Sequence, residues 1–442
     1  MKLEISAGAR YILQTLAAAG FEAHLVGGCV RDLLRGVTPC DWDICTSARP
    51  EETERCFSGR RIIETGLKHG TVTVMVEGEP YEITTYRTEG PYSDSRRPDY
   101  VRFVPNLTED LARRDFTMNA IAMDLERNLR DPFGGAADIE RGLIRCVGEP
   151  GRRFREDGLR VMRALRFAAV FGYGIEEQTA RAVHENRAML GRVAAERING
   201  ELRRLLVGRS VGDILRRYPD VFCQFWPQLE PLVGLEQRNP WHCWGGWEHT
   251  VRAVEAAPAD VTLRLAMLLH DIGKPACKST GEMGIDHFYG HPAVSARQAD
   301  EMLRALKFDN KTRERVVLLV ERHDVQIPPR GQVIRRWLNR LGPEAFFQLL
   351  EVKRADGMGQ DLEKVKDRLL ELDEIRAKAE RILAEGQCLT VRDLAVNGRD
   401  VTAAGMEPGP EVGRVLEGLL ERVLSGELPN ERGALLAALQ KR

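Results

Sequence analysis

The feature of the 442-residue sequence that most restricts its fold is a change in the spacing of apolar residues near Pro150. Beyond this point, segments such as DGLRVMRALRFAAVFG place apolar residues at three- and four-residue steps, which predicts amphipathic helices almost to the end of the chain. Before it, FEAHLVG, TVTVMVEG and YEITTYR alternate apolar and polar residues, as short strands do. The sequence therefore predicts an α+β protein, in which a small mixed β-sheet with helices over it is followed by an extended all-α part.

This change of pattern divides the chain into four predicted domains. A head at residues 1–145 contains the sheet and begins with a predicted helix over residues 6–20. The helical remainder is divided into a neck at 146–210, a body at 211–385 and a tail at 386–442.

Composition excludes several classes of protein. No apolar run approaches the roughly 20 residues of a membrane-spanning helix, and the N-terminus lacks a signal-peptide pattern, so we expect a cytoplasmic protein. The nine cysteines are scattered singly with no CxxC pair, which indicates reduced thiols rather than a disulfide framework or a zinc knuckle. The net charge is −1, but residues 141–210 contain 15 arginines, no lysine and 8 acidic residues, a local charge of +7. This indicates a phosphate-bearing partner, with a solvated helical face as the alternative.

The stretch HLVGGCVRDLLRGVTPCDWDICT, residues 24–46, indicates a site for phosphate groups and metal ions. Gly27 and Gly28 follow a predicted strand and precede a helical segment, so their amides can face a phosphate at a helix N-terminus. Asp41 and Asp43 lie two residues apart on an extended segment and therefore point to the same side. Two such carboxylates repel each other, and a divalent cation is the usual reason for holding them together.

Glu82, in the strand YEITTYR, is a candidate third acidic ligand, with an exposed strand glutamate as the alternative. The glycine pair, an Arg-Asp pair, a spacer, Asp-x-Asp and this later acid together resemble the metal site of the DNA polymerase β-like nucleotidyltransferases. Four further motifs follow in order: EDLARRDFTMNAIA (109–122), DPFGGAAD (131–138), EDGLR (156–160) and ERINGE (196–201). With them, residues 20–210 resemble the class II tRNA nucleotidyltransferases, the CCA-adding enzymes and their relatives, and residues 388–434 do so more loosely.

The resemblance implies template-independent addition of CCA, or part of it, to tRNA 3′ ends from CTP and ATP. Asp41, Asp43 and Glu82 would be the catalytic acids, with Asp41 and Asp43 holding Mg²⁺ for two-metal phosphoryl transfer. The expected nucleotide-binding residues are Gly27, Gly28, Arg31, Arg113, Arg114, Asp115, Asn119, Asp157, Arg160, Arg163 and Arg166. The resemblance further implies that DPFGGAAD is a hinge and that the polar loop at 87–103 supports addition of the terminal A. We expect no membrane association, and no protein partner is implied.

Two residues of EDGLR are predicted to read the base. Asp157 and Arg160 are at positions i and i+3, so we expect them on one helix face, where a base edge can meet an acceptor and a donor together. Asp157 can accept from the exocyclic amino group of cytosine or adenine, and Arg160 can donate to the neighbouring ring acceptor. Uracil and guanine would place a carbonyl opposite the carboxylate. A surface salt bridge is the alternative interpretation.

A second group of motifs lies in the helical body, at about residues 240–360. LLHDIGKP, GHPAVSA, ERHD and RADG resemble the HD phosphohydrolase domain, in which helices of a bundle supply metal ligands. The expected ligands of one divalent metal are His249, His270, Asp271 and Asp356. His291 and His323 are candidates for phosphate contact or a second metal, although ERHD departs from the His-His pair common in that family. Hydrolysis of phosphomonoesters or 2′,3′-cyclic phosphates on RNA ends is implied, with a structural role as the alternative.

Other functions remain open from the sequence alone. Bacterial poly(A) polymerase shares the head motifs, and an HD phosphohydrolase with a nucleotide-sensing head is a further alternative. Full CCA addition is not separated from CC-only or A-only addition, and the sequence leaves open the oligomeric state and the metal and activity of the HD site.

Overall fold

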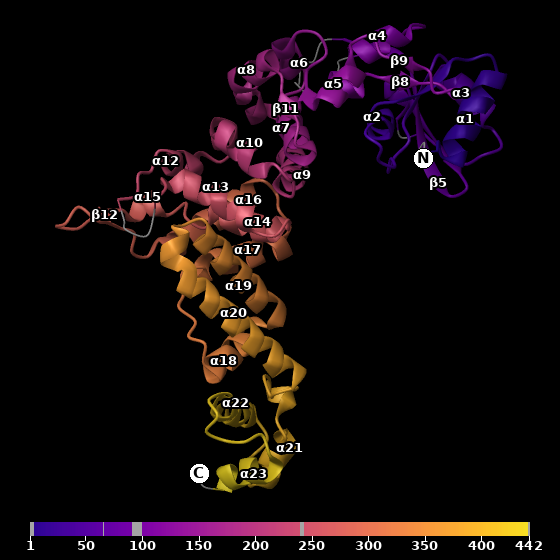
Figure 1. Ribbon diagram of the computed structural model, residues 1–442. Coiled ribbons are helices and arrows are strands. Elements are labelled where there is room, and N and C mark those ends of the chain that lie inside the picture. The colour runs from indigo at the N-terminus through magenta and orange to yellow at the C-terminus, as the bar shows by residue number, and fades with distance from the viewer. Residues whose placement is uncertain (1–3, 65, 91–99, 239–242, 441–442) are drawn as a thin grey trace. The chain divides into compact units, whose positions relative to one another are not determined.

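The computed structural model describes residues 4–64, 66–90, 100–238 and 243–440. The chain divides into two compact units, Met1–Pro227 and Gln228–Arg442. The first unit combines a mixed β-sheet with helices, and the second is mostly helical (Figure 1). The predicted α+β fold is confirmed, whereas the finer division into four domains stays a prediction. None of the helices in the described ranges is both long enough and apolar enough to cross a membrane.

The sheet of the first unit has the strand order β3-β4-β5-β2-β1-β8-β9. Its strands are β1 Ala23–Val26, β2 Ile44–Thr46, β3 Ile62–Ile63, β4 Thr71–Val76, β5 Glu79–Thr85, β8 Ala122–Met123 and β9 Leu129–Arg130. Strands β2 and β5 are parallel, and the other neighbouring pairs are antiparallel. The three predicted strands correspond to β1, β4 and β5. The two- and three-residue strands were not predicted, because so few residues show no periodicity.

Helices cover this sheet and close its core. The predicted helix over 6–20 is α1, Ala7–Ala18, which begins where the Ser6 hydroxyl accepts a hydrogen bond from the Ala9 amide. Helix α1 packs on β1, β2 and β5. The other helices of the head are α2 Gly28–Leu34, α3 Pro50–Cys56, α4 Leu107–Ala112 and α5 Gly135–Arg141. Shorter strand pairs lie outside the sheet, namely β6 Arg87–Glu89 with β7 Val101–Phe103, and β10 Leu143–Ile144 with β11 Gly174–Ile175.

The predicted helical segments after Pro150 are present in the first unit. They are α6 Pro150–Glu156, α7 Leu159–Phe171, α8 Glu177–Glu185, α9 Ala195–Leu206, α10 Val211–Arg217 and α11 Pro219–Phe225. Helix α7 packs along α9 and buries Met162, Leu165 and Phe167. The helix is interrupted at Asp157, whose backbone is extended with φ −141° and ψ 107°. This residue separates α6 from α7. This interruption determines where the side chains of EDGLR lie relative to one another.

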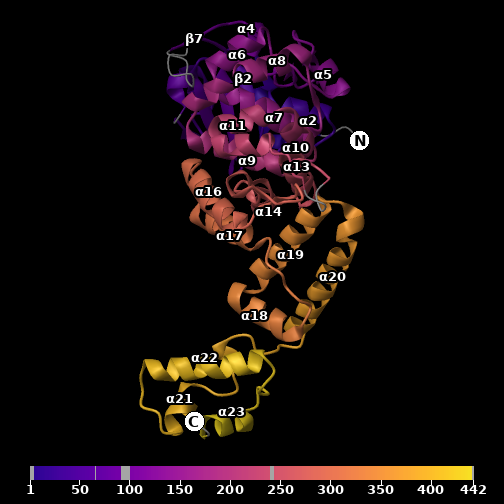
Figure 2. The same cartoon turned by 90° about the vertical axis from the view of Figure 1, so that its left-hand side faces the viewer.

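The second unit surrounds helix α14 with other helices. Its helices are α12 Glu230–Val233, α13 Gly246–Ala256, α14 Val261–Leu269, α15 Lys274–Cys277, α16 His291–Ala305, α17 Asn310–Arg322, α18 Gly331–Leu341, α19 Pro343–Met358, α20 Leu362–Ala384, α21 Gly398–Ala403, α22 Pro410–Leu424 and α23 Arg432–Gln440. Helix α14 contacts α13, α17 and α19 and is buried from Leu263 to Leu269. Helices α21 and α22 pack together near the C-terminus (Figure 2).

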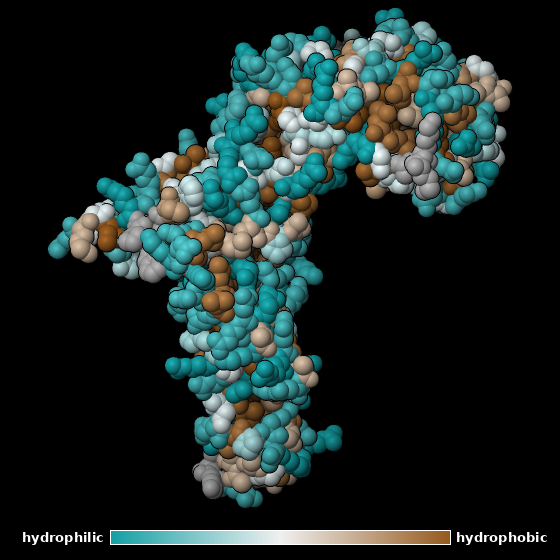
Figure 3. Space-filling model, in the orientation of Figure 1, coloured by the Kyte–Doolittle hydropathy of each residue, from teal (hydrophilic) through white to brown (hydrophobic). Residues whose placement is uncertain are grey.

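One part of the second unit departs from the helical prediction. Strands β12 Ser279–Thr280 and β13 Asp286–His287 form a short antiparallel hairpin between α15 and α16. Hydrophilic side chains cover most of the visible surface of this unit, with smaller apolar areas between them (Figure 3).

Candidate active site and metal centre

A cavity of about 790 Å³ lies within the first unit. Every residue predicted to bind the nucleotide lines it, and so do Asp43 and Glu82. Asp41 is exposed and precedes β2 on the same segment as Asp43, but it is not among the lining residues. The structure therefore gathers residues of four separated motifs around one cavity.

The parallel pairing of β2 with β5 sets two of the acids side by side. Ile44 is opposite Ile83, so Asp43, which immediately precedes β2, lies next to Glu82. Burial raises the pKa of Asp43; the nearby Arg114 opposes this shift, whereas Glu82 and Asp41 add to it. A buried carboxylate beside two further acidic residues has the donor chemistry of a divalent cation site.

The glycine pair brings the backbone close to these charges. Gly27 has φ 77°, a conformation that favours glycine, and a Cβ there would lie 3.0 Å from Nη1 of Arg114. Arg31, on the following helix α2, forms an ion pair with Asp32 and donates from Nη1 to Oδ1 of Asn119 at 2.9 Å. The side chains of VRD and RRDFTMN are thus joined in one network.

The basic residues of the cavity are held by buried carboxylates. Arg113 pairs with Glu89 and Asp110, and Arg114 pairs with Asp110. Asp115 pairs with Arg163, at 2.6 Å. These two side chains come from different elements of the fold, so the pairing could not be inferred from adjacency.

Asp115 is the centre of a second buried group. It accepts from Asn119 Nδ2 at 3.0 Å and from the Phe116 amide at 2.8 Å. Burial alone would raise its pKa, but Arg163 and Asn119 hold the pKa of Asp115 well below its usual range. Arg163 also lies 3.9 Å from Glu201 of ERINGE, which pairs with Arg166 at 2.5 Å.

The expectation that Asp157 and Arg160 share one helix face is wrong. Asp157 is extended between α6 and α7, whereas Arg160 belongs to the first turn of α7. Arg197 donates to both carboxylate oxygens of Asp157, at 3.2 and 2.8 Å. Arg160 pairs with Glu156 at 2.7 Å and donates to the Arg113 carbonyl. Both residues still line the cavity.

Arg197 is a site residue that was not assigned from the sequence. It lines the cavity, and it belongs to ERINGE, a motif for which no individual role was predicted. Arg197 lies on α9, and its partner Asp157 is 40 positions away. Only the packing of α9 against α7 brings them together.

Two further predictions concern the loops. In DPFGGAAD, Asp131 accepts from the amides of Gly135 and Ala136, and a Cβ on Gly135 would lie 2.1 Å from the Thr117 carbonyl oxygen. The close approach gives Gly135 a packing reason, and the hinge stays a prediction. Residues 91–99 of the predicted 87–103 loop lie outside the described residues, while β6 and β7 pair at its ends.

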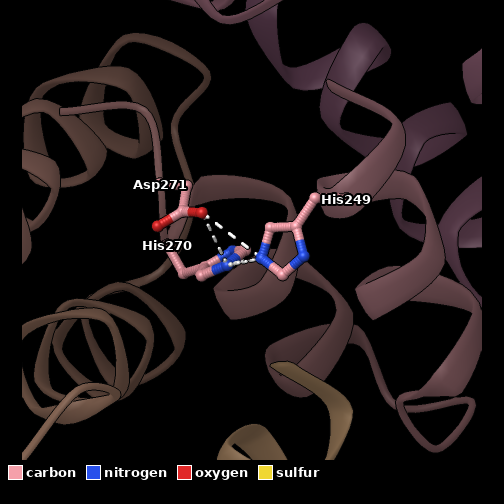
Figure 4. Close-up of side chains that lie close together, drawn as sticks. All are labelled: His249, His270 and Asp271. Atoms are coloured by element: carbon pink, nitrogen blue, oxygen red, sulfur yellow. Dashed lines mark hydrogen bonds and ion pairs between the residues drawn. The ribbon is translucent and has the colours of Figure 1, made fainter. Parts of the chain in front are cut away.

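The second unit brings the predicted HD residues to one buried centre. His249 lies on α13, His270 and Asp271 follow α14, and Asp356 lies on α19. The Nε2 atoms of His249 and His270 are 3.1 Å apart, and Asp271 Oδ2 lies 3.4 and 3.2 Å from them (Figure 4). Asp356 Oδ1 is 3.2 Å from His249 Nε2.

A second group shares Asp271. His291 begins α16 and His323 follows α17, and their Nε2 atoms are 3.2 Å apart. Asp271 Oδ1 lies 3.2 Å from His291 Nε2 and 3.8 Å from His323 Nε2. The ligand-capable atoms of Asp271, His291 and His323 all lie within 4.8 Å of one another, as do those of His249, His270 and Asp271.

Hydrogen bonds orient all four imidazoles in the same way. Each Nδ1 meets a backbone carbonyl, and since a carbonyl only accepts, each Nδ1 must be the donor. The partners are Gly359 for His249, Met267 for His270, Phe288 for His291 and Val320 for His323, at 2.7 to 3.0 Å. This leaves the Nε2 atoms facing one another, as in histidines that bind a metal through Nε2.

The pKa values of the histidines differ across the centre. Burial lowers the pKa of His270, but Asp271 and Asp356 outweigh it and raise the pKa to about 10. Burial and the neighbouring His270 lower the pKa of His323 to about 3. The donor set of nitrogens and carboxylates fits a divalent metal of the zinc, manganese or iron type.

The chain is similar to proteins of one kind along its whole length. Residues 23–145 match the model of the poly A polymerase head domain, 172–218 that of the probable RNA and SrmB-binding site of polymerase A, and 288–439 that of a tRNA nucleotidyltransferase domain 2. The CCA-adding enzyme of Lactiplantibacillus plantarum is 35% identical over 97% of this chain and 94% of its own. That of Geobacillus kaustophilus is 36% identical over 98% and 96%.

A solved structure supports the same relationship. The crystal structure of the Bacillus stearothermophilus CCA-adding enzyme in complex with CTP matches with a TM-score of 0.73 and 32% identity. The match covers 99% of this chain and 98% of that one.

Proposed function

Because this chain belongs to the family of CCA-adding enzymes and is therefore a tRNA nucleotidyltransferase, we propose that the cavity of the first unit binds CTP and ATP and adds CCA to tRNA 3′ ends by two-metal nucleotidyl transfer. The observation that carries this proposal is the position of Asp43 and Glu82 in the same cavity as Asp157 and Arg160. Acids for metal binding and groups for base contact thus share a space large enough for one nucleotide.

The reaction joins the terminal 3′-oxygen of tRNA to the α-phosphorus of the incoming nucleotide. The bond from the α-phosphorus to the bridging oxygen breaks, pyrophosphate leaves, and the hydroxyl proton passes to solvent. Asp41, Asp43 and Glu82 would hold Mg²⁺, which supplies activation of the hydroxyl and neutralisation of the triphosphate. Arg113 and Arg114 line the cavity and add positive charge for the triphosphate.

Base selection would depend on a carboxylate that the fold has already oriented. Arg197 donates to both oxygens of Asp157, and each oxygen keeps a further lone pair for the amino group of cytosine or adenine. Arg160 would serve as the donor beside it. Uracil and guanine would present a carbonyl to the Asp157 carboxylate and lose that hydrogen bond.

The test uses three tRNA transcripts, ending before the CCA, after CC and after CCA. Each is incubated with the protein, Mg²⁺ and labelled CTP and ATP, singly and together, and the products are sized on a gel. Three residues added to the first transcript and none to the last are the expected result. Two C residues only, or A only on the transcript ending in CC, would restrict the activity to part of CCA, and long A tails would favour a poly(A) polymerase instead.

A second candidate function belongs to the metal centre of the second unit. Four imidazole Nε2 atoms face the carboxylates of Asp271 and Asp356. Burying these polar atoms together costs folding free energy unless a cation is bound between them. The expected single site is His249, His270, Asp271 and Asp356, and the contacts of Asp271 Oδ1 support a second site with His291 and His323. The centre would hydrolyse phosphate esters on RNA ends.

Hydrolysis at this centre can be tested directly. In hydrolysis, a water oxygen bonds to phosphorus, the ester bond breaks and the ribose oxygen leaves with a proton. Lys274, whose Nζ lies 2.6 Å from Asp271 Oδ2, and Arg368, which pairs with Asp356, line a cavity of about 280 Å³ beside the centre and can receive the phosphate. Release of inorganic phosphate from an RNA ending in a 3′-phosphate, lost in His270→Ala, is the expected result. If wild type and variant release it equally, the centre is structural.

A further inference from the structure

The cavity of the metal centre has an aromatic rim. His287 and Tyr289 both line it, and their rings are stacked, with centroids 5.3 Å apart and planes 8° from parallel. Tyr289 is 80% exposed, which is far more than tyrosine packing requires. Large aromatic faces left open beside a cavity are typical of positions that bind a flat ligand.

The hairpin that carries these rings is fixed in place. Asp286, immediately before His287, is buried and accepts from the Arg238 amide and the Lys278 ammonium, each at 3.0 Å. It also accepts from the Thr280 hydroxyl across the hairpin at 2.7 Å. Because these contacts hold β13 in place, the stacked rings are positioned before any ligand arrives, and binding costs less conformational entropy.

The same cavity is also lined by charged residues. There, Lys274 is only 4% exposed and Arg368 is partly buried, and each pairs with a carboxylate of the metal centre. A ligand in this cavity therefore meets cations and metal ligands as well as aromatic faces. A phosphate joined to a flat heterocycle can make both kinds of contact. A simple sugar phosphate or glycerol phosphate has no flat ring that could stack.

We propose that His287 and Tyr289 form a base-stacking platform, and that the metal centre acts on nucleoside monophosphate groups, either free or at an RNA 3′ end. This inference rests on the proposed hydrolytic function of the centre. Stacking tolerates any base, because every base has a π face, so the platform selects for the presence of a base and not for its identity. The phosphate lies towards Lys274 and Arg368.

The first experiment compares two secondary phosphate esters, adenosine 3′-monophosphate and glycerol 2-phosphate, with Mn²⁺ present. In Tyr289→Ala, the ratio of kcat/KM for the nucleotide to that for glycerol 2-phosphate is expected to fall about tenfold or more, mainly through KM. Tyr289→Phe keeps the ring and should keep the ratio. Met283→Ala alters a side chain on the same hairpin that is 85% exposed and does not line the cavity, and it should also keep the ratio. An unchanged ratio in Tyr289→Ala overturns the proposal.

A binding measurement separates this proposal from the hydrolytic function. If the wild-type protein hydrolyses neither ester, the function proposed for the centre fails, and calorimetric titration with adenosine 3′-monophosphate decides the platform. The first unit is identical in wild type and Tyr289→Ala, so any nucleotide bound there cancels in the comparison. Weaker binding to Tyr289→Ala but not to Tyr289→Phe supports the platform, and equal binding overturns it.

The source of the nucleotide is tested in parallel. An RNA oligonucleotide ending in a 3′-phosphate is compared with an identical one whose last residue is abasic. A loss of turnover with the abasic RNA, reproduced by Tyr289→Ala on the normal RNA, assigns the platform to RNA ends. If only the free mononucleotide depends on Tyr289, the ligand is the free nucleotide.

Discussion

Asp43 and Glu82 lie side by side because β2 and β5 are parallel and pair Ile44 with Ile83. Nearly 40 residues separate the two acids in the sequence, so their proximity is a consequence of the sheet register and not of local spacing. A shift of β5 by one residue would turn Glu82 to the opposite face of the sheet and separate the pair. The register therefore connects the topology of the first unit to its proposed chemistry.

Asp43→Asn is expected to abolish nucleotide addition and to stabilise the metal-free protein slightly. The substitution removes a negative charge that burial, Glu82 and Asp41 all disfavour. We expect nucleotide addition to fall by about 1,000-fold or more, as the loss of a metal ligand implies. In EDTA, the melting temperature of the first unit should rise by a few degrees. Calorimetry and gel assays measure the two effects. Retained addition would contradict the assignment, and a lowered transition would contradict the electrostatic argument.

Asp157→Ala is expected to weaken the discrimination of C and A against U and G more than it weakens metal binding. Arg197→Ala should have a smaller effect in the same direction, because Arg197 orients the carboxylate through two hydrogen bonds. Arg203→Ala is a matched control on the same helix, since Arg203 bonds to Asn199 and does not line the cavity. Misincorporation of UTP and GTP is measured at fixed tRNA. If both variants exclude UTP and GTP as wild type does, Asp157 does not read the base.

The prediction for EDGLR shows what sequence reasoning could and could not supply. The order of the motifs predicted Asp157 and Arg160 as residues that read the base; both line the cavity, and the role stays a prediction. Their spacing predicted a shared helix face, which is wrong. The extended Asp157 interrupts the helix, and capping geometry of this kind is poorly determined by periodicity.

The metal centre shows the same limit at longer range. The sequence identified His249, His270, Asp271 and Asp356 from motif resemblance alone, and all four meet in the bundle. The roles of the partners depend on packing that spacing does not reveal, such as the Nδ1 bond from His249 to the Gly359 carbonyl across 110 positions. The β12–β13 hairpin escaped prediction because its strands contain only two residues each.

Asp115→Asn is expected to destabilise the protein in a pH-dependent way. The pKa of Asp115 in the folded protein is well below the ordinary value of 3.8, mainly because Arg163 and Asn119 outweigh its burial. Its carboxylate therefore stabilises the fold above pH 3.8, and this contribution is lost as the pH falls towards the folded pKa. We expect Asp115→Asn to cost about 1–3 kcal/mol at pH 7 and progressively less below pH 4. Urea unfolding at pH 7, 5 and 3.5 measures the difference, and a constant gap would contradict it.

The purified protein is expected to contain up to two equivalents of divalent transition metal, held in the second unit. His323→Ala should lose one equivalent, because His323 belongs only to the group that Asp271 and His291 complete, whereas Asp271→Asn should lose both. His184→Ala is a control, since His184 pairs with Asp220 in the first unit and should leave the metal content unchanged. Elemental analysis after dialysis counts the metal.

Removal of the metal should also weaken the second unit, since a cation bound only to the folded state at 100 times its Kd contributes about 2.7 kcal/mol. EDTA should then lower the thermal transition of wild type more than that of Asp271→Asn, which has already lost its metal. The metal has this effect because the four Nε2 atoms face one another. Without a cation, their lone pairs are held close together unless protons are bound between them. A transition that EDTA lowers equally in both proteins would place the bound metal elsewhere, and a protein that contains no transition metal after growth in supplemented medium would remove the basis for hydrolysis at this centre.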